Sequence, residues 1–578
     1  MSPMKRSSSL LTLVGESNQG NPRSAKSRMA EPCRPAVACV ATTGPRGRRQ
    51  RRARSSLSSV ALMSNDLKDL ARRREMALQM GGQDSIDFHH GRGKLTVRER
   101  LDLLVDPGSL REFGGLVGRS SYDENNDLVD FTPKGEVNAV AEIDGRKVVI
   151  SGGDFTVRGG SASAHGGLGE ELRPSERARE WQLPFVRLLD AAGGSVRGFE
   201  EMGRTYLPDG NSFTQSDVLL LNQVPVVSAV MGSVAGLPAV NACMAHWNVM
   251  VDGTSQIFPG GPPVVKAALG YDITKEELGG PEIHTRISGC IDNLASSEQD
   301  ALDQVRRFLS YLPSSVNELA PYVPTDDPID RAESELRDLV PDNPRRIHDA
   351  RKILELVLDR DSFFEIAPDF GRARITGLAR IGGYPIGVMA NNPKFDGGAT
   401  GVAAGSKVMR LMQLCDTFHL PLISLADEPG FHVGIESEKE GIERAGARMV
   451  AMTCMTRMPW MTVVVRRLYG VAGQCHHRPT GMFRRYCWPT ARWGSMHIAG
   501  GTSAAYRREI ADAADPQAKQ QEIEDRLNAL ASPFRTAEAT GQDIIDPAKT
   551  RLMLAEFVAD AQKVLATQLG PPALPYLP

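Results

Sequence analysis

The sequence predicts an α/β fold in which two copies of one unit follow each other along the chain. Motifs of the first half recur in the same order in the second half, which indicates an internal duplication. In both halves apolar strand-like runs alternate with helix-like runs, and this alternation is typical of mostly parallel sheets. The chain has 578 residues, of which 41% are hydrophobic and 24% charged. This is enough material for two cores of roughly 250 residues each.

The first repeated element is a helix that ends in a turn and leads into a strand. Apolar residues at helical spacing, Leu95, Leu101 and Leu104, predict a helix that ends at the turn Asp106-Pro107-Gly108. The first copy of the pattern consists of Arg98, Leu101, Leu104, Val105, Asp106, Ser109, Glu112 and Phe113, and the second of Arg351, Leu354, Val357, Leu358, Asp359, Ser362, Glu365 and Ile366.

Strands and helices then follow in the same order in each half. A β-like stretch over residues 142–150 turns at Asp144-Gly145, and residues 380–388 repeat it with Gly382-Gly383 at the turn. The remaining apolar runs predict strands at 147–151 and 385–390, and helices at 407–418 and 441–452.

In each half a glycine-rich turn directly follows an apolar run. The first turn spans residues 232–238 and the second spans 469–473, and each comes after a segment that ends in glycine, at Gly193 and Gly430 respectively. A strand that ends in small residues and opens a helix aims free backbone N–H groups at one point, as in an oxyanion hole. A single such motif would more often be only a tight turn in a parallel sheet, but two copies at matching places favour a functional role.

The familiar catalytic motifs are missing. The chain has no GxSxG elbow, no P-loop, no HExxH helix and no complete dinucleotide fingerprint. The stretch Cys475-His476-His477 raises the alternative of a metal site. Adjacent histidines project apart and no third ligand is evident nearby, so we expect no metal.

Cysteine usage and hydropathy indicate a protein of a reducing compartment. The eight cysteines form no CxxC pair, which argues against a zinc ribbon and a secreted disulfide framework and favours the cytoplasm. The best candidate for a membrane span is the uncharged run 224–251. We expect a strand, a glycine turn and a buried helix there instead, with no membrane association, because polar and proline residues interrupt the run: Pro225, Pro238, Asn241, His246 and Asn248.

The first 62 residues differ from the rest of the chain. They contain twelve Lys and Arg residues against only Glu16 and Glu31, whereas the whole chain has a net charge of −2, so the remainder is acidic. This segment could be a nucleic-acid patch, a mitochondrial transit peptide that would place the protein in the matrix, or the product of an upstream start codon with Met63 as the working start. We expect a disordered tail at 1–62 and domains at 63–320 and 321–578, joined by the Pro- and acid-rich stretch 313–344.

Several separated motifs occur in the order typical of one enzyme family. They are Gly93–Arg100, Gly261–Lys266, Glu276–Gly280, His284-Thr285, Ser288-Gly289, Asp427–Phe431 and Trp488–Ala491. From about Leu67 to the C-terminus the chain resembles the carboxyltransferase (β) subunits of acyl-CoA carboxylases, such as those of the propionyl-CoA and methylcrotonyl-CoA enzymes.

The resemblance implies a fold, a reaction and partners. The fold would be a pair of crotonase-like domains, arranged in a homo-oligomer with a hexameric core. The reaction would move a carboxyl group from carboxybiotin to the α (or vinylogous) carbon of an acyl-CoA. Biotin would be carried by a partner subunit that contains the biotin carboxylase or the biotin carboxyl carrier, and we expect neither nucleic acid nor membrane as a partner.

The resemblance also implies roles for the two turns. Charge develops on the thioester oxygen and on the ureido oxygen of biotin, so two oxyanion holes are needed. Gly236 and Leu237 would serve the thioester, whereas Val471 and Ala472 would serve biotin, across a subunit interface. The freed biotin nitrogen would take the α-proton, so no general base is required. Substrate-binding residues would be Gly193, Gly430, Gly470, Gly473 and Gln474.

Both turns depart from the usual family pattern. Relatives carry Gly-Gly-Ala where this chain has Gly236-Leu237-Pro238, and Pro238 has no N–H to donate. In the second half the usual Gly-Gly-Ala-Tyr-Asp becomes residues 470–474, with Gln474 at the position of the Asp. Two alternatives therefore stay open: a non-catalytic structural or regulatory subunit, and the carboxyltransferase component of a decarboxylase.

Overall fold

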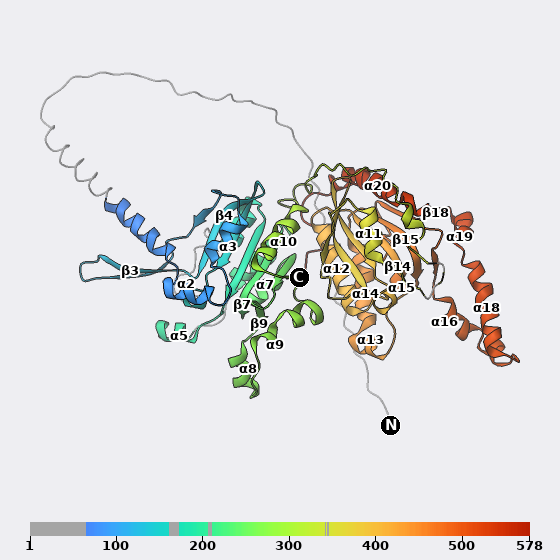
Figure 1. The fold of residues 1–578 in the computed structure, drawn as a ribbon, viewed down its shortest axis with the longest axis horizontal. Coiled ribbons are helices and arrows are strands. Elements are labelled where there is room, and N and C mark those ends of the chain that lie inside the picture. Colours follow the sequence, from blue (N-terminus) through green and yellow to red (C-terminus); the bar gives the residue numbers. More distant parts are fainter. Residues whose placement is uncertain (1–64, 161–172, 206–210, 342, 344–345) are drawn as a thin grey trace, which may run out of the picture. The chain divides into compact units, whose positions relative to one another are not determined.

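The computed structural model describes residues 65–578 except 161–172, 206–210, 342 and 344–345. The chain separates into two units, Met1–Leu67 and Lys68–Pro578. The second unit contains every element discussed below (Figure 1). The tail expected at 1–62 lies outside the described residues.

Two eight-stranded sheets follow each other along the chain. The first has the order β1-β4-β5-β6-β7-β8-β10 with β9 beside β7, and the second has the order β11-β12-β13-β14-β15-β16-β18 with β17 beside β15. The equal orders confirm the predicted duplicated α/β fold. The first-half strands are β1 (Arg111–Phe113), β4 (Glu136–Ile143), β5 (Arg146–Gly153), β6 (Phe185–Ala191), β7 (Val226–Ala235), β8 (Trp247–Val251), β9 (Gln256–Phe258) and β10 (Asn293–Ala295), with a separate hairpin of β2 (Gly118–Tyr122) and β3 (Leu128–Pro133). The second-half strands are β11 (Phe364–Ile366), β12 (Arg374–Ile381), β13 (Tyr384–Asn391), β14 (Leu422–Glu428), β15 (Trp460–Tyr469), β16 (Phe483–Cys487), β17 (Arg492–Gly494) and β18 (Asp543–Ile544).

The strand pairing of the two sheets also agrees in detail. β4 and β5 form an antiparallel hairpin, as do β12 and β13, and the strands that follow are parallel. The β6/β7 ladder shifts register between Leu189 and Ala191, and the β14/β15 ladder shifts between Ala426 and Glu428. In each sheet the register shift comes shortly before the glycine turn. The two turns therefore lie at equivalent places, directly after the carboxyl end of β7 in the first sheet and of β15 in the second.

Helices cover the sheets. In the first half α10 packs against α3, β7 and β8, and in the second half α12 contacts β12 and β13 while α20 contacts β12, β13 and β15. The first-half helices are α2 (Gln83–His90), α3 (Val97–Leu104), α4 (Pro174–Trp181), α5 (Val196–Met202), α6 (Asn211–Leu220), α7 (Leu237–Cys243), α8 (Pro262–Leu269), α9 (Lys275–Gly279), the π-helix η3 (Glu282–Ile287) and α10 (Glu298–Ser310). The second-half helices are η4 (Ser334–Arg337), α11 (Ala350–Val357), α12 (Val402–Thr417), α13 (Ile435–Glu440), α14 (Ile442–Met455), α15 (Gly470–Gln474), α16 (Ile498–Ala505), α17 (Arg507–Ala511), α18 (Pro516–Leu530), α19 (Pro533–Thr540) and α20 (Thr550–Leu565).

Aromatic residues join the cores of the two halves. Trp247 of β8 stacks on Phe308 of α10 with ring centroids 5.2 Å apart, and it meets Phe364 of β11 edge-on at 5.5 Å. All three side chains are buried. The boundary proposed near residue 320 falls in the irregular segment between α10 and α11.

The run 224–251 has the expected order of strand, glycine turn and helix. The prediction of a buried helix was wrong, because the seven-residue α7 buries only Ala239 and Ala242. Leu237 and Val240 are 53% and 55% exposed. Within the described ranges, no helix is long and apolar enough to cross a membrane.

Candidate functional site

The first glycine turn leaves a backbone amide free. Gly236 has φ 69° and ψ −136°, a conformation that favours glycine, and its N–H donates to the Phe258 carbonyl at 3.2 Å. Leu237 is the first residue of α7, so its N–H has no intrahelical partner, and it finds no acceptor among the described residues. Pro238 offers no N–H. The turn therefore presents one free donor, that of Leu237.

A second glycine allows the chain to pass close to this turn. Gly193, at φ 80°, follows β6, and a Cβ at this position would lie 2.6 Å from the Ala235 carbonyl oxygen. Ala235 is the residue that precedes Gly236. The structure thus brings Gly193 and Gly236 together, at the ends of neighbouring parallel strands.

A buried ion-pair cluster lies beneath the first turn. The Lys94 ammonium is 2.7 Å from the Asp190 carboxylate, and Arg100 contacts the same carboxylate at 3.2 Å. Arg100 also binds both oxygens of Glu298, each at 2.7 Å. Burial lowers the pKa of Lys94, although the charge of Asp190 opposes this shift. A Cβ at Gly232 would lie 2.1 Å from Asp190 Oδ1, so glycine in β7 makes room for the cluster.

The second glycine turn has the same construction. Gly470, at φ 62°, follows β15 and opens the short helix α15. The N–H groups of Val471 and Ala472 lie in the first turn of α15, where no intrahelical acceptor exists, and neither has another backbone partner among the described residues. The Val471 side chain is 50% exposed, whereas Ala472 is fully buried.

A cavity of about 730 Å³ opens beside the second turn. Four of the predicted site residues line it: Gly470, Val471, Gly473 and Gln474. The other lining side chains are both apolar and polar, among them Leu468, Trp493, Arg485 and Gln542. Its volume lies within the roughly 300–1,000 Å³ that small-molecule pockets occupy. Ala472, Gly193, Gly236, Leu237 and Gly430 are not part of this lining.

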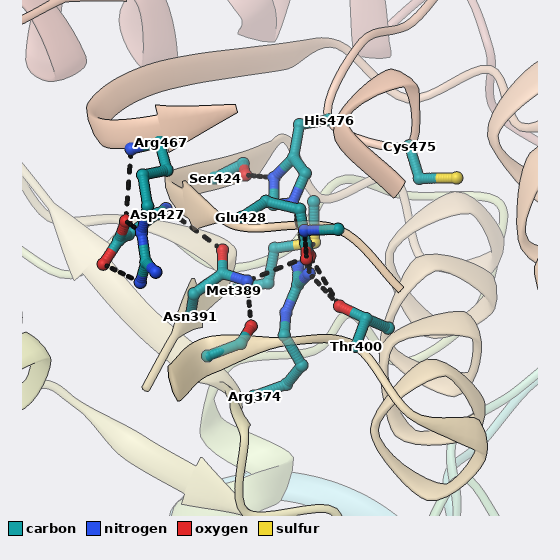
Figure 2. Close-up of polar contacts among 12 residues, drawn as sticks. Arg374, Met389, Asn391, Thr400, Ser424, Asp427, Glu428, Arg467, Cys475 and His476 are labelled. Atoms are coloured by element: carbon teal, nitrogen blue, oxygen red, sulfur yellow. Dashed lines mark hydrogen bonds and ion pairs between the residues drawn. The ribbon is translucent and has the colours of Figure 1, made fainter. Parts of the chain in front are cut away.

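A buried polar network surrounds Glu428 in the second half of the chain (Figure 2). Glu428, the last residue of β14, accepts hydrogen bonds through Oε2 from Arg374 Nη1 at 2.9 Å, Asn391 Nδ2 at 3.0 Å and Thr400 Oγ1 at 2.5 Å. Arg374 and Glu428 are completely buried. Burial by itself would raise the pKa of Glu428, but its contacts with His476 and Arg374 outweigh burial and lower the pKa.

His476 connects this network to the second turn. Its Nδ1 lies 2.7 Å from Ser424 Oγ, and its Nε2 lies 3.1 Å from Arg374 Nη1. Burial, aided by the positive charge of Arg374, lowers the pKa of His476 to about 4. The imidazole is therefore neutral near pH 7, with Nδ1 beside Ser424 Oγ and Nε2 beside both Arg374 Nη1 and, at 3.5 Å, Glu428 Oε2. The His476 N–H donates to the carbonyl of Gly473, so the network is tied to the turn itself.

The two adjacent histidines lie in different surroundings. His477 leaves the network and meets the Phe483 ring edge-on, with centroids 4.5 Å apart. Burial raises the pKa of the neighbouring Cys475 thiol to about 12, which disfavours a thiolate ligand. In the part of the chain that the structure describes, no group of three His, Cys, Asp or Glu side chains is arranged to hold a metal ion.

Gly430 contributes to the network rather than to the cavity. Its φ is 131°, and its N–H donates to Glu428 Oε1 at 3.0 Å. Its carbonyl accepts from the Thr400 N–H at 3.1 Å. The sequence predicted Gly430 as a substrate-binding residue, and that role stays a prediction. Sequence reasoning did not select the charged residues near the two turns, such as Lys94, Arg100, Arg374 and Glu428.

Comparisons with known proteins agree on one family. The model of the carboxyl transferase domain matches residues 88–567. The chain is 34% identical to the carboxyltransferase subunit of propionyl-CoA carboxylase from Haloferax mediterranei, over 88% of this chain and 98% of that protein. It is 30% identical to subunit alpha of methylmalonyl-CoA decarboxylase from Propionigenium modestum, over 86% of this chain and 96% of the relative.

Solved structures show the same similarity. The hexameric transcarboxylase 12S with methylmalonyl-CoA bound superposes with a TM-score of 0.78 at 30% identity, over 89% of this chain and 98% of that one. A single-chain, multi-domain long-chain acyl-CoA carboxylase matches with a TM-score of 0.72 at 26% identity, over 85% of this chain and 50% of that protein. These similarities support a pair of crotonase-like domains.

Proposed function

The chain belongs to the carboxyl transferase family, and from this premise we propose that it carries a carboxyl group from carboxybiotin to the carbon beside the thioester of an acyl-CoA. It is the carboxyltransferase of a biotin-dependent acyl-CoA carboxylase. Biotin is carried by a partner subunit that holds the biotin carboxylase or the carrier protein, and the chain works as a homo-oligomer with a hexameric core. The supporting observations are the full-length similarity to a propionyl-CoA carboxylase subunit and to a hexameric transcarboxylase.

The observation that carries the proposal is the pair of equivalent turns with free amides. Carboxyl transfer places negative charge on two oxygens, the thioester oxygen of the enolate and the ureido oxygen of biotin, and a duplicated fold offers one turn for each. The N–H of Leu237, at the turn opened by Gly236, stabilises the thioester oxygen. The N–H groups of Val471 and Ala472 stabilise the biotin oxygen.

The roles of the two domains follow from the turns. Residues 63–320 bind the acyl-CoA and residues 321–578 bind biotin, and one active site combines the first turn of one subunit with the second turn of another. Gly193 allows the close approach at the first turn. At the second turn, Gly470, Gly473 and Gln474 line the 730 Å³ cavity, which is large enough for part of a substrate.

No protein side chain is needed as a general base. Bound carboxybiotin would supply both the carboxyl group and a nitrogen base, so the residues at the turns bind and orient rather than titrate. The carboxylate of Glu428 and the imidazole of His476 are completely buried. They keep the second turn in place rather than exchange protons with the substrate.

The compartment is the cytoplasm. The six cysteines within the described residues are all free thiols, which suits a reducing environment. If the first 62 residues act as a transit peptide, the compartment is the mitochondrial matrix instead.

Transcarboxylation of free biotin tests the activity of the single chain. The purified protein, incubated with methylmalonyl-CoA or malonyl-CoA and free biotin, is expected to release propionyl-CoA or acetyl-CoA in a biotin-dependent manner. With ATP, bicarbonate and propionyl-CoA it should carboxylate only after a biotin carboxylase and a carrier are added. A well-folded protein that is inactive in both assays would support the non-catalytic subunit.

A further inference from the structure

Two cysteines from separate segments meet at the end of α7. Cys243 is the last residue of this helix, and Cys290 lies between η3 and β10. Cys243 Sγ is 3.7 Å from the carbonyl oxygen of Cys290. The buried Asn248 side chain donates through Nδ2 to the carbonyls of both Ala242 and Cys290, each at 2.9 Å. One amide group therefore holds the two cysteine-bearing segments against each other.

Hydrogen-bonding side chains surround Cys290. Its N–H donates to Ser288 Oγ at 3.3 Å, and Ser288 Oγ lies 3.0 Å from His284 Nδ1. His284 is fixed by its Nε2, which is 3.0 Å from the Ile257 carbonyl. Cys290 is exposed and Cys243 is half-buried, so small molecules can reach the pair.

The surroundings give the two thiols different acidities. Hydrogen bonds from Cys243 and then from His284 lower the pKa of Cys290 to about 4, although burial opposes the shift. The pKa of Cys243 is raised, first by its contact with Cys290 and then by burial. The other charged groups near Cys243 are Asp292 and Arg410, which pair with each other at 2.5 Å. Cys290 thus has the character of an attacking thiolate, and Cys243 supplies a neighbouring thiol.

We propose that Cys290 and Cys243 form a site of reversible oxidation by peroxides, in which Cys290 attacks and Cys243 resolves. The site lies outside both glycine turns, and the proposal does not depend on carboxyl transfer. A disulfide requires two cysteines whose chains are already close. The Cys243 sulfur lies beside the backbone of Cys290, and the Asn248 side chain binds the carbonyls of Ala242 and Cys290, so the two segments are adjacent.

The chemistry balances with hydrogen peroxide as the oxidant. The Cys290 thiolate attacks one peroxide oxygen, the O–O bond breaks, and hydroxide leaves, so that sulfur loses two electrons and becomes a sulfenic acid. Cys243 then attacks this sulfur, the S–O bond breaks, and the departing hydroxide takes the thiol proton to form water. Overall, two thiols and one peroxide give one disulfide and two waters.

Mapping of oxidised thiols tests the proposal on the full chain. After treatment with hydrogen peroxide, peptide mass spectrometry should find a Cys243–Cys290 disulfide and the loss of two thiols per chain, both reversed by dithiothreitol. Cys243→Ala should leave Cys290 as a sulfenic acid that dimedone traps. Cys290→Ala and Cys290→Ser should abolish the disulfide. Cys454→Ala, at another exposed cysteine, is the matched control and should leave the disulfide intact.

Alkylation rates test the thiolate directly. Between pH 6 and 8 the iodoacetamide rate at Cys290 should change by less than about twofold, because a thiol with a pKa near 4 is already ionised. An ordinary thiol would react about 100-fold faster at pH 8 than at pH 6. A disulfide that maps to other cysteines, no disulfide at all, or a Cys290 rate that rises as for an ordinary thiol would each overturn the proposal.

Discussion

The carboxylates of Asp106 and Asp359 make the same pair of hydrogen bonds in the two halves of the chain. Asp106 accepts from the N–H groups of Asp144 at 3.1 Å and Gly145 at 2.7 Å. Asp359 accepts from Gly382 at 2.9 Å and Gly383 at 2.8 Å. Each aspartate therefore fastens the end of a helix to the turn of the hairpin that follows it, which explains why the sequence repeats them.

The two aspartates should differ in their contribution to stability. Asp359 is 5% exposed and also pairs with the buried Arg551 at 2.7 Å. Asp359→Ala leaves that guanidinium without its closest carboxylate, so we expect a loss of about 3 kcal/mol in the free energy of unfolding. Asp106→Ala, whose partners reach water, should lose about 1 kcal/mol. Urea unfolding of both variants measures the difference, and equal losses would contradict the role of Arg551.

Much of the fold could be predicted from such repeated local signals. The sequence shows the aspartate that ends each helix, the glycines of each hairpin, and the order of strand, glycine turn and helix. Each of these signals depends on residues close together in the chain. The repeated order of these signals then predicted the two matching sheets. The burial of α7 could not be predicted in this way, because it depends on which distant segments cover the helix.

The residues beneath the turns were missed for the same reason. Lys94 and Asp190 are far apart in the sequence, as are Arg374 and Glu428, and neither pair has a recognisable spacing. The one available signal was indirect. Lys94 and Arg100 belong to the motif Gly93–Arg100, and Glu428 belongs to Asp427–Phe431, two of the motifs that carry the family resemblance.

Protonation of His476 should destabilise the protein at acid pH. The folded state lowers the pKa of His476 from the ordinary histidine value of 6.5 to about 4, because of burial and the charge of Arg374. The stability that depends on the neutral imidazole is therefore fully present above pH 6.5 and is lost as the pH falls from 6.5 toward 4. The slope of the unfolding free energy against pH is proportional to the number of protons taken up on unfolding. His476→Gln should reduce that number by up to about one in this pH window.

A control substitution that leaves every titratable group in place separates this effect from general acid denaturation. Gln474 is exposed and lies two residues before His476, and Gln474→Asn should leave the slope close to that of the unaltered chain. The measurement is urea unfolding at closely spaced pH values between 4 and 7.5. If His476→Gln and Gln474→Asn have equal slopes, the buried neutral imidazole is not the cause.

The amides of the two turns should be needed for turnover rather than for folding. Leu237→Pro removes the free N–H at the first turn, and Val471→Pro removes one at the second. Loss of a single oxyanion donor typically reduces kcat by about 100- to 1,000-fold, and we expect a reduction of this size in each variant. Transcarboxylation of free biotin measures it, with circular dichroism to verify the fold.

Alanine variants are the matched controls for these prolines. Leu237→Ala and Val471→Ala remove the exposed side chains but keep the N–H groups. They should retain kcat within about tenfold of the unaltered chain, since a backbone donor does not depend on its side chain. Equal losses in the alanine and proline variants would show that the side chains, and not the amides, carry the effect.

Gln474 should influence which acyl group is preferred. It is exposed and lines the 730 Å³ cavity. The family resemblance implies a tyrosine and an aspartate where this chain has Gly473 and Gln474, and the smaller, neutral pair would make the site roomier and less charged. We therefore expect the chain to prefer a longer, branched or unsaturated acyl group over acetyl or propionyl. Gln474→Asp should change the ranking of kcat/KM across acetyl-, propionyl-, butyryl- and branched acyl-CoAs.

The size of this effect is limited by the physics of apolar pockets. One methylene is worth about 1–3 kcal/mol, or about 10- to 200-fold in kcat/KM, so the preference should be graded rather than absolute. Gln474→Asn is the control, because it shortens the side chain as Gln474→Asp does but adds no charge. If only the aspartate variant changes the ranking, the charge at this position selects the acyl group. If neither variant changes it, or if the unaltered chain prefers acetyl-CoA, Gln474 does not set the specificity even though the carboxyltransferase reaction stands.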